Sequence, residues 1–183
     1  MRNLWVVPLC LAAAACSGGE GENKAAAAET PDTLPAGSWK TDFEVKSFRS
    51  ADQTTPALKA KPGDKEEARG CVAANERSKP SPGLFAGAGY QCTYANSYFR
   101  GGMINASMTC TRPELKGQIN MTVTGSFDAD SFDVTVDEAS YLPGPGDFVM
   151  SRKVKGKVTP GACEPVAAPA GAAPAGGKAK AGG

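Results

Sequence analysis

The chain of 183 residues contains no histidine, the residue most often used as a general base and as a metal ligand. An enzyme built on this sequence would have to rely on carboxylates, lysine or tyrosine. An excess of one charge is also missing, since 20 Lys and Arg stand against 19 Asp and Glu. A net charge of +1 gives no electrostatic basis for binding nucleic acid. We therefore expect a protein that is not an enzyme, needs no cofactor and binds no nucleic acid.

Close C-x-x-C pairs, the usual spacing of a zinc site, are missing as well. Apart from Cys10 and Cys16 near the N-terminus, the chain has four cysteines, which are Cys71, Cys92, Cys110 and Cys163. An even number of cysteines in an exported domain indicates two disulfides, for which three connectivities are possible. The sequence therefore predicts structural disulfides and no metal site.

No apolar run is long enough to cross a bilayer as a helix. The N-terminus, "MRNLWVVPLCLAAAACSGGEGEN", has a positive start at Arg2, a short apolar run, and small residues that end at Cys16. This pattern is typical of a secretory signal, and a small-residue run ending in cysteine resembles a bacterial lipoprotein signal. We expect residues 1–15 to be the signal peptide and Cys16 to be lipidated. The alternative is ordinary cleavage within the alanine run.

Composition divides the rest of the chain into three parts. Residues 16–35 are rich in Gly, Ala and Glu and lack aromatic residues, which predicts a flexible linker above the membrane. Residues 166–183, "VAAPAGAAPAGGKAKAGG", predict a disordered Ala/Pro/Gly/Lys tail. The remaining residues, 36–165, have the length of one domain.

Within this domain, apolar residues recur with a period of two, as in half-buried strands. Trp39, Thr41, Phe43 and Val45 share one face of the first such segment, and Phe48 falls out of phase, which predicts a bulge near Lys46 or Ser47. Three later segments continue the pattern, with inward residues Ile119, Met121, Val123 and Phe127; Phe132, Val134 and Val136; and Phe148, Met150, Val154 and Val158. No segment predicts an amphipathic helix of three turns, although Asp64 to Arg69 is compatible with one helical turn.

The stretch "QCTYANSYFRGGMINASMTC" predicts a hairpin closed by a disulfide. If Arg100 to Gly102 forms a three-residue loop, Tyr98 pairs with Ile104, Tyr94 with Met108, and Cys92 with Cys110, all on one face. Directly opposed cysteines meet the short Cα separation of a disulfide. Elimination then leaves Cys71–Cys163. The expected fold class is all-β: an antiparallel, twisted sheet or partial barrel of about six or seven strands, stapled by these two disulfides.

The order of these features resembles a known family. The chain has a first strand opening with "PAGSW", a cysteine in "GCVAANE", the cysteine hairpin, a second hairpin with Gly125, and a final strand "SRKVKGKVTPGAC". Together they resemble the domain of unknown function 3617 family of small exported proteins from Gram-negative bacteria, over about Pro35 to Glu164. The resemblance implies export, disulfides and a β architecture, and brings no activity, cofactor or catalytic residue.

Three groups of side chains are candidate sites. The acids Asp128, Asp130, Asp133 and Asp137 surround a predicted turn, but they lack the spacing of a calcium loop, which favours turn chemistry over a cation site. The lysines Lys153, Lys155 and Lys157 form a row that would either contact an anionic surface or be a solvated strand face. The aromatics Tyr90, Tyr94, Tyr98 and Phe99 would line an apolar pocket or pack in the core.

These observations predict a lipid-anchored protein of the bacterial cell envelope that faces the periplasm. We expect a non-enzymatic binding module for a small apolar molecule or an envelope protein, held to the membrane through its N-terminal lipid. The alternative is an inhibitor of an envelope-degrading enzyme, acting through a loop at Pro80–Gly89 or Pro143–Asp147.

Overall fold

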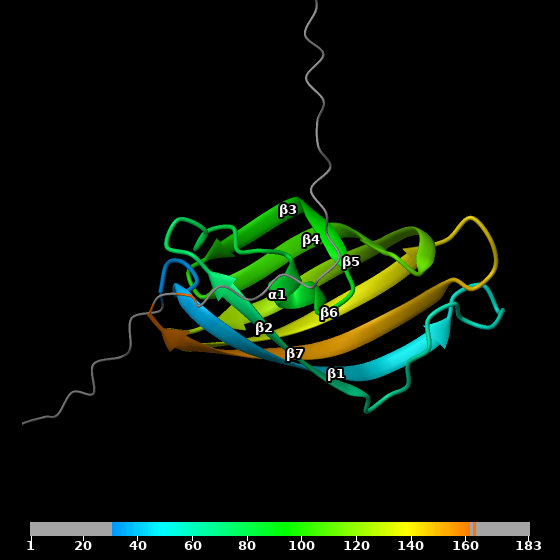
Figure 1. Ribbon diagram of the computed structural model, residues 1–183, viewed down its shortest axis with the longest axis horizontal. Helices are drawn as coiled ribbons and strands as arrows, with labels where there is room; N and C mark the ends of the chain where they lie inside the picture. Colours follow the sequence, from blue (N-terminus) through cyan, green and yellow to red (C-terminus); the bar gives the residue numbers. More distant parts are fainter. Residues whose placement is uncertain (1–30, 162, 164–183) are drawn as a thin grey trace, which may run out of the picture.

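The computed structural model describes residues 31–161 and 163, which form one curled antiparallel sheet (Figure 1). Its elements are β1 (Gly37–Ser50), β2 (Lys65–Val72), α1 (Gly83–Ala86), β3 (Gln91–Arg100), β4 (Met103–Arg112), β5 (Leu115–Phe127), β6 (Ser131–Tyr141) and β7 (Phe148–Pro160). The seven strands lie in the order β2-β1-β7-β6-β5-β4-β3. The sheet therefore curls into a half-barrel with β2 and β3 at its two edges, which confirms the predicted fold class.

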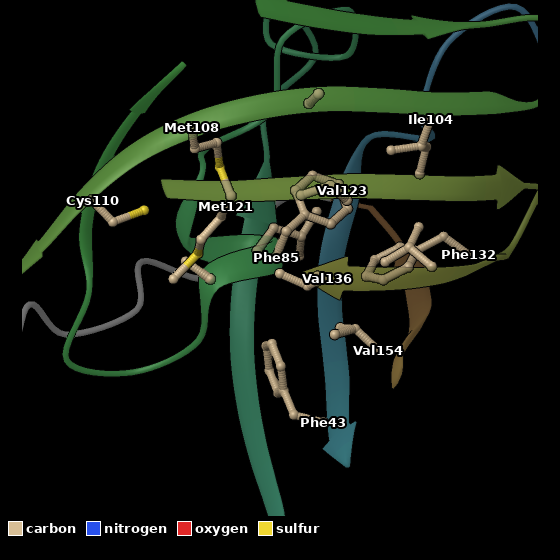
Figure 2. Packing of buried hydrophobic residues seen from close by; sticks show 14 of the residues in the cluster. Phe43, Phe85, Ile104, Met108, Cys110, Met121, Val123, Phe132, Val136 and Val154 are labelled. Atoms are coloured by element: carbon tan, nitrogen blue, oxygen red, sulfur yellow. The ribbon is translucent and has the colours of Figure 1, made fainter. Parts of the chain in front are cut away.

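The hydrophobic core lines the inner face of this half-barrel (Figure 2). Every strand from β4 to β7 alternates buried and more exposed residues over most of its length, as a sheet with one covered face requires. The inward residues predicted for β1, β5 and β6 are buried as expected, including Trp39, Met121 and Val134. The apolar period of two thus placed most of the core correctly.

The short helix α1 covers the inner face where the sheet does not close on itself (Figure 1). Its Leu84, Phe85 and Ala86 are buried. The Phe85 ring stacks on Phe99 with centroids 5.6 Å apart and lies 5.2 Å from the ring of Phe132. Phe85 thus links β3, at one edge, to β6 in the middle of the sheet, and closes this half of the concavity.

The predicted bulge in β1 is present. The β1–β7 register shifts between Val45 and Ser47, so Lys46 is the extra residue. The shift lets Phe48 return to the inner side, where its ring lies 5.6 Å from that of Phe148.

The predicted turn of the β3–β4 hairpin was wrong. The strands pair Arg100 with Met103, so the loop has two residues, Gly101 and Gly102, with φ of 59° and 72°. Positive φ at both positions is the geometry of a type I′ turn, which glycine adopts without strain. A second shift, between Tyr94 and Asn96, cancels the first and restores the predicted pairing of Tyr94 with Met108.

Because of the shorter turn and the bulge, the β3 side chains between Asn96 and Arg100 face the opposite side of the sheet from the one expected. Phe99, paired with Ile104, points inward and is buried, whereas Tyr98 pairs with Asn105 and is 51% exposed. The expectation that Tyr98 faces the core was therefore wrong. The cause is a bulge, because one extra residue moves every side chain up to the turn to the opposite face.

The helical turn expected at Asp64 to Arg69 was also wrong, because Lys65 to Arg69 belongs to β2 and Asp64 immediately precedes that strand. Its charged sequence, "KEEAR", favours a helix by local propensity. Pairing with β1, from Glu44↔Lys65 to Gly37↔Val72, overrides that propensity. Charged side chains on an edge strand also discourage pairing with other chains.

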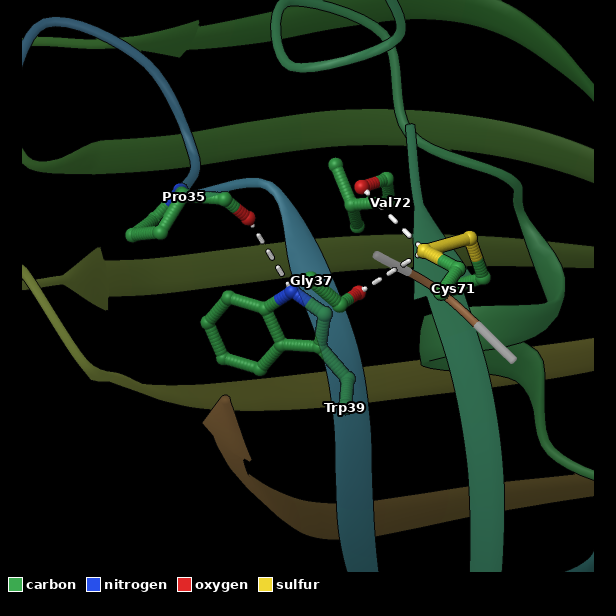
Figure 3. Close-up of a disulfide and its surroundings, with 6 residues drawn as sticks. Pro35, Gly37, Trp39, Cys71 and Val72 are labelled. Carbon is green, nitrogen blue, oxygen red and sulfur yellow. Dashed lines mark hydrogen bonds between the residues drawn. A yellow bond between two sulfur atoms is a disulfide. The ribbon is translucent and has the colours of Figure 1, made fainter. Parts of the chain in front are cut away.

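Two disulfides fasten the sheet, in the pairing expected from the sequence. Cys92 and Cys110 lie opposite each other in the hairpin with Cα atoms 4.0 Å apart, and Cys71 joins Cys163 with Cα atoms 5.5 Å apart. The second bridge ties the segment after β7 to the end of β2, beside Gly37 and Val72 (Figure 3). Nearby, the Trp39 indole N–H donates to the Pro35 carbonyl at 3.2 Å.

Packing on the domain begins before its expected first residue. Leu34 is fully buried, its N–H donates to the Arg77 carbonyl at 3.2 Å, and the Arg77 Nε donates back to the Leu34 carbonyl at 2.9 Å. The expected signal peptide, the lipidation site Cys16, most of the expected linker and the expected tail lie outside the described residues. Among the residues that are described, no helix is long and apolar enough to cross a membrane.

Candidate ligand-binding cleft

A buried polar cluster interrupts the apolar inner face beside the C-terminal end of α1. Glu138 on β6 and Arg152 on β7 are each 3% exposed. The Arg152 Nη2 lies 2.5 Å from the Glu138 Oε1, and the Tyr90 hydroxyl donates to the other carboxylate oxygen at 2.8 Å. Tyr90 thus hydrogen-bonds one carboxylate oxygen of Glu138, and the other oxygen is held by charge attraction to Arg152 without hydrogen-bond geometry.

The segment that includes and follows α1 covers Arg152. Its Nη2 also donates to the Ala86 carbonyl at 2.8 Å, and its guanidinium carbon lies 5.1 Å from the centre of the Phe43 ring. Gly87 closes over the same group: a Cβ at this position would lie 3.3 Å from the Arg152 Nη1 and 3.4 Å from Phe43. Gly87 also has a φ of 81°, so glycine suits both the space and the backbone.

Burial governs the titration of this cluster. Desolvation raises the pKa of the Glu138 carboxyl above its ordinary value, against the opposing effect of Arg152. Desolvation also raises the pKa of the Tyr90 hydroxyl, and the nearby Glu138 charge adds to it. Tyr90 is thus a neutral hydrogen-bond donor at physiological pH. Its hydrogen bond to Glu138 helps to hold the buried pair of Glu138 and Arg152 in place.

A cleft of about 230 Å³ opens beside this cluster. Phe43, Val45, Leu58, Ala60 and Met150 supply its apolar wall, and Lys59, Asp64, Lys65, Glu66, Tyr90, Arg112 and Arg152 supply its polar groups. These residues come from β1, β2, β4, β7 and the two connections that flank β2. The cleft is thus about as polar as it is apolar, and an apolar wall with converging polar groups is the combination that small-molecule sites use.

Arg112 and Tyr90 form one side of the cleft. The Arg112 guanidinium carbon lies 4.5 Å from the centre of the Tyr90 ring, and its Nε lies 2.5 Å from a carboxylate oxygen of Glu114. The Arg152 guanidinium carbon lies 5.4 Å from the same ring. Tyr90 therefore lies within cation–π distance of two arginines and holds both beside the cleft.

The connection between β1 and β2 supplies Leu58, Lys59 and Ala60 to the cleft, and Asp52 fixes this connection. The Asp52 carboxylate accepts from the Thr54 hydroxyl at 2.8 Å and from the backbone N–H of Gly146 at 2.8 Å. These hydrogen bonds, the first above all, hold the pKa of Asp52 well below its usual range. The connection that carries Leu58 and Ala60 is thereby tied to the β6–β7 loop.

The aromatic group predicted from the sequence is only partly brought together. Tyr90 lines the cleft, whereas Tyr94 is half-buried and packs edge-on against Phe99 at 5.8 Å. Burial raises the pKa of the Tyr94 hydroxyl. Tyr98 points to the outer face, so of the three tyrosines only Tyr90 belongs to the candidate site.

The predicted acidic group lies on the outer face and in the β5–β6 turn. Asp133 forms ion pairs with Lys153 and Lys155 of the neighbouring strand, and Asp130 lies 3.8 Å from Lys157. The row of lysines and these acids therefore face each other across β6 and β7. Within residues 31–161 and 163, no group of three or more His, Cys, Asp and Glu side chains is arranged to hold a metal ion.

The two loops considered for an inhibitor have different surroundings. Within Pro80–Gly89, α1 buries its large side chains in the core, and the exposed part forms one wall of a groove of about 640 Å³ along the edge strand β2. Pro143–Asp147 is tied down by Asp52 and by the Asp147 carboxylate, which accepts from the Ser140 hydroxyl at 2.8 Å.

Comparison with known proteins identifies the family of the chain and assigns no function to the cleft. Residues 34–163 match the family described as Protein of unknown function (DUF3617). The chain belongs to this family. No curated protein and no solved structure matches the chain. The DUF3617 match spans the whole sheet and both disulfides, including the cleft.

Glu138 and Arg152 are the site residues that the sequence interpretation missed. The signal for both was present in the period of two. One further step from Val134 and Val136 leads to Glu138, and Arg152 lies midway between Met150 and Val154. The sequence interpretation assigned neither residue to a face, although the period of two places both on the inner one.

Proposed function

We propose that this DUF3617 domain is a non-enzymatic binding module of the bacterial cell envelope that takes a small, largely apolar molecule into the cleft. The observation that carries this proposal is the cleft itself, in which Phe43, Met150 and Leu58 meet a buried, hydrogen-bonded ion pair. A small sheet protein gains little stability from a buried ion pair compared with apolar residues of similar size. A role in recognising a ligand would explain why the protein has a buried ion pair beside the cleft.

The state of the charged groups supports binding over catalysis. A general acid or base must reach the substrate with a proton to give or accept. The Glu138 carboxylate is paired with Arg152, accepts a hydrogen bond from Tyr90, and is almost fully buried, so it has little access to a substrate. Burial raises the pKa of Tyr90, so that it does not ionise near neutral pH. These groups are suited to fixing the position of a ligand.

Placement in the envelope is part of the same proposal. Two disulfides fit an oxidising compartment, and the N-terminal sequence fits export followed by lipidation of Cys16. Replacing Cys16→Ser should move the protein from the membrane fraction to the soluble periplasmic fraction. Continued association with the membrane would count against the lipid anchor.

Native mass spectrometry tests the binding proposal. The Cys16→Ser protein, incubated with an extract of its own cell envelope, should retain an adduct of a few hundred daltons. The variant Ala60→Phe, which fills the cleft without changing charge, should lose that adduct. Ala129→Phe in the exposed β5–β6 turn is the matched control and should keep it.

Other outcomes of this experiment separate the remaining candidates. An adduct that survives in Ala60→Phe would place the ligand outside the cleft and overturn the proposal. A protein-sized adduct would favour a partner at a sheet edge, where the groove beside β2 offers strand backbone with no neighbour on that side. The inhibitor alternative remains a prediction, and absence of inhibition of muramidases and proteases would remove it.

A further inference from the structure

We propose that the ligand of the cleft carries an anionic oxygen group, held by Arg112 and Arg152, with its apolar part against Phe43 and Met150. This inference rests on the proposed function, because it names the chemical class of the molecule that the cleft takes. Three observations support it: unused hydrogen-bond donors beside the cleft, an excess of cationic over acidic side chains in its lining, and the volume of the cleft.

The first observation is a buried donor without an acceptor. Arg152 lines the cleft, and its Nη2 is shared between Glu138 and the Ala86 carbonyl. Its Nε is buried and has no hydrogen-bond partner among the described residues. A buried donor without an acceptor loses its hydration without compensation, and the loss is larger for a charged group. The nearby Glu138 Oε1 is also without a hydrogen-bond partner, so the guanidinium and the carboxylate leave hydrogen-bonding capacity unused, and an acceptor oxygen entering the cleft would use the donor.

The second observation is the imbalance of free charge around the cleft. Lys59 and Lys65 are exposed at its rim and form no ion pair within the described part of the chain. The acids at the same rim accept hydrogen bonds from the backbone: Glu66 from the Ala88 N–H at 2.9 Å, and Asp64 from the Lys61 N–H at 2.9 Å. These hydrogen bonds leave both carboxylates charged, but the lining of the cleft still holds four cationic side chains, Lys59, Lys65, Arg112 and Arg152, against two acidic ones.

Arg112 adds a donor that is already oriented. Only its Nε is used in the ion pair with Glu114, while a guanidinium carries five N–H donors in one plane. Contact with the Tyr90 ring at 4.5 Å fixes that plane beside the cleft. A planar, fixed guanidinium is suited to bind a carboxylate or phosphate through two parallel hydrogen bonds.

The size of the cleft limits the ligand. A volume of about 230 Å³, at roughly 30 Å³ for each water-sized group, has room for about eight such groups. Octanoate has one anionic end and an apolar chain of suitable length. Octan-1-ol has the same chain without the charge, so this pair isolates the contribution of the anionic group.

Titration calorimetry of the Cys16→Ser protein with these two probes tests the inference. We expect octanoate to bind at least about tenfold more tightly than octan-1-ol, with a preference that weakens as salt is added. The double variant Lys59→Gln/Lys65→Gln, at exposed positions, should weaken octanoate binding several-fold and leave octan-1-ol unchanged. Lys157→Gln, on the outer face, removes a like charge and should change neither.

The outcomes separate this inference from the proposed function. Equal affinities for the two probes would overturn the proposal that the ligand needs an anionic group. Octanoate binding that survives in Ala60→Phe would overturn the proposal that the anionic ligand binds in the cleft. In the first case an apolar ligand in the cleft would still stand. Failure of both probes to bind, together with the absence of any small adduct in native mass spectrometry, would overturn the proposed function and this inference with it.

Discussion

At the scale of single residues, the most consequential feature is the ion pair between Glu138 and Arg152 on the inner face. Two inward positions of a small core are occupied by charges, and both ions lose nearly all of their hydration. Tyr90 and the Ala86 carbonyl offset part of that loss by hydrogen bonding to the pair. The stability of the domain should therefore depend strongly on both partners being present.

Replacing Arg152→Met should lower the free energy of unfolding by about 3–5 kcal/mol at neutral pH, because it leaves Glu138 charged and buried without its partner. The pKa of Glu138 is already raised by burial from its ordinary 4.5, and loss of Arg152 should raise it further. A raised pKa means that the native state binds more protons than the unfolded chain between these two values. Stability then falls as the pH rises through that window. Urea unfolding at pH 5 and at pH 8 should show the larger loss at pH 8.

The double variant Glu138→Gln/Arg152→Met is the control for this prediction. It removes both charges, so it should be more stable than Arg152→Met and should lose the excess dependence on pH. If Arg152→Met unfolds at the same urea concentration at both pH values, its native and unfolded states bind the same number of protons over this range, which would contradict a raised pKa of Glu138.

Close approach at Gly156 is a second feature of single residues. A Cβ at this position of β7 would lie 2.1 Å from an atom of the Phe132 ring on β6. Gly156→Ala must therefore displace the ring from its contacts with Trp39 and Phe85, and should cost about 1–3 kcal/mol. Gly144→Ala, whose Cβ would meet nothing within 4 Å, is the matched control. Equal unfolding midpoints for the two variants would show that the ring gives way without cost.

At the scale of elements, the hairpin of β3 and β4 depends on its turn. Gly101 has a φ of 59°, in the region that asparagine tolerates and β-branched residues do not. Gly101→Asn should leave the free energy of unfolding almost unchanged, because Asn-Gly suits a type I′ turn. Gly101→Val should lower it by about 1–2 kcal/mol. Urea unfolding of the two variants measures this difference, and a similar loss for both would argue for a different turn.

The strands and their inward residues were predictable from the sequence where one face of the strand is buried and no bulge interrupts it. The alternation in β1, β5 and β6 fixes which side chains enter the core, since a slip of one residue would expose all of them. It fails near Ala95, where the β3 bulge reverses Tyr98 and Phe99 without any change in composition. It also fails for β2, because an edge strand with exposed charges has no apolar period to detect.

The candidate site was less predictable than the fold for a related reason. Its residues come from strands and connections that are distant in sequence, and each connection is positioned by local hydrogen bonds such as those of Asp52. The sequence identified Tyr90 as a candidate, but nothing in its neighbourhood predicts contacts with Arg112 and Arg152. Only the curling of the sheet and the path of the segment after α1 bring these three side chains together.

At the scale of the whole molecule, the sheet remains open between β2 and β3, and the two disulfides act on this opening differently. Cys92–Cys110 spans 18 positions inside one hairpin, whereas Cys71–Cys163 spans 92 and joins the edge strand β2 to the end of β7. The gain from closing a loop grows with its length. The longer bridge should therefore contribute more to the stability of the whole sheet.

The paired variants Cys92→Ser/Cys110→Ser and Cys71→Ser/Cys163→Ser test this expectation. Loop closure predicts upper losses of about 3 kcal/mol for the first and between about 4 and 5 kcal/mol for the second, measured by urea unfolding. Hydrogen exchange should add a spatial signature. Loss of Cys71–Cys163 should increase exchange in β2 and in the last residues of β7, because the bridge lies beside Gly37 and Val72 at that corner. A larger loss from the hairpin variant would show that native contacts around the bridge, and not the length of the closed loop, determine its contribution.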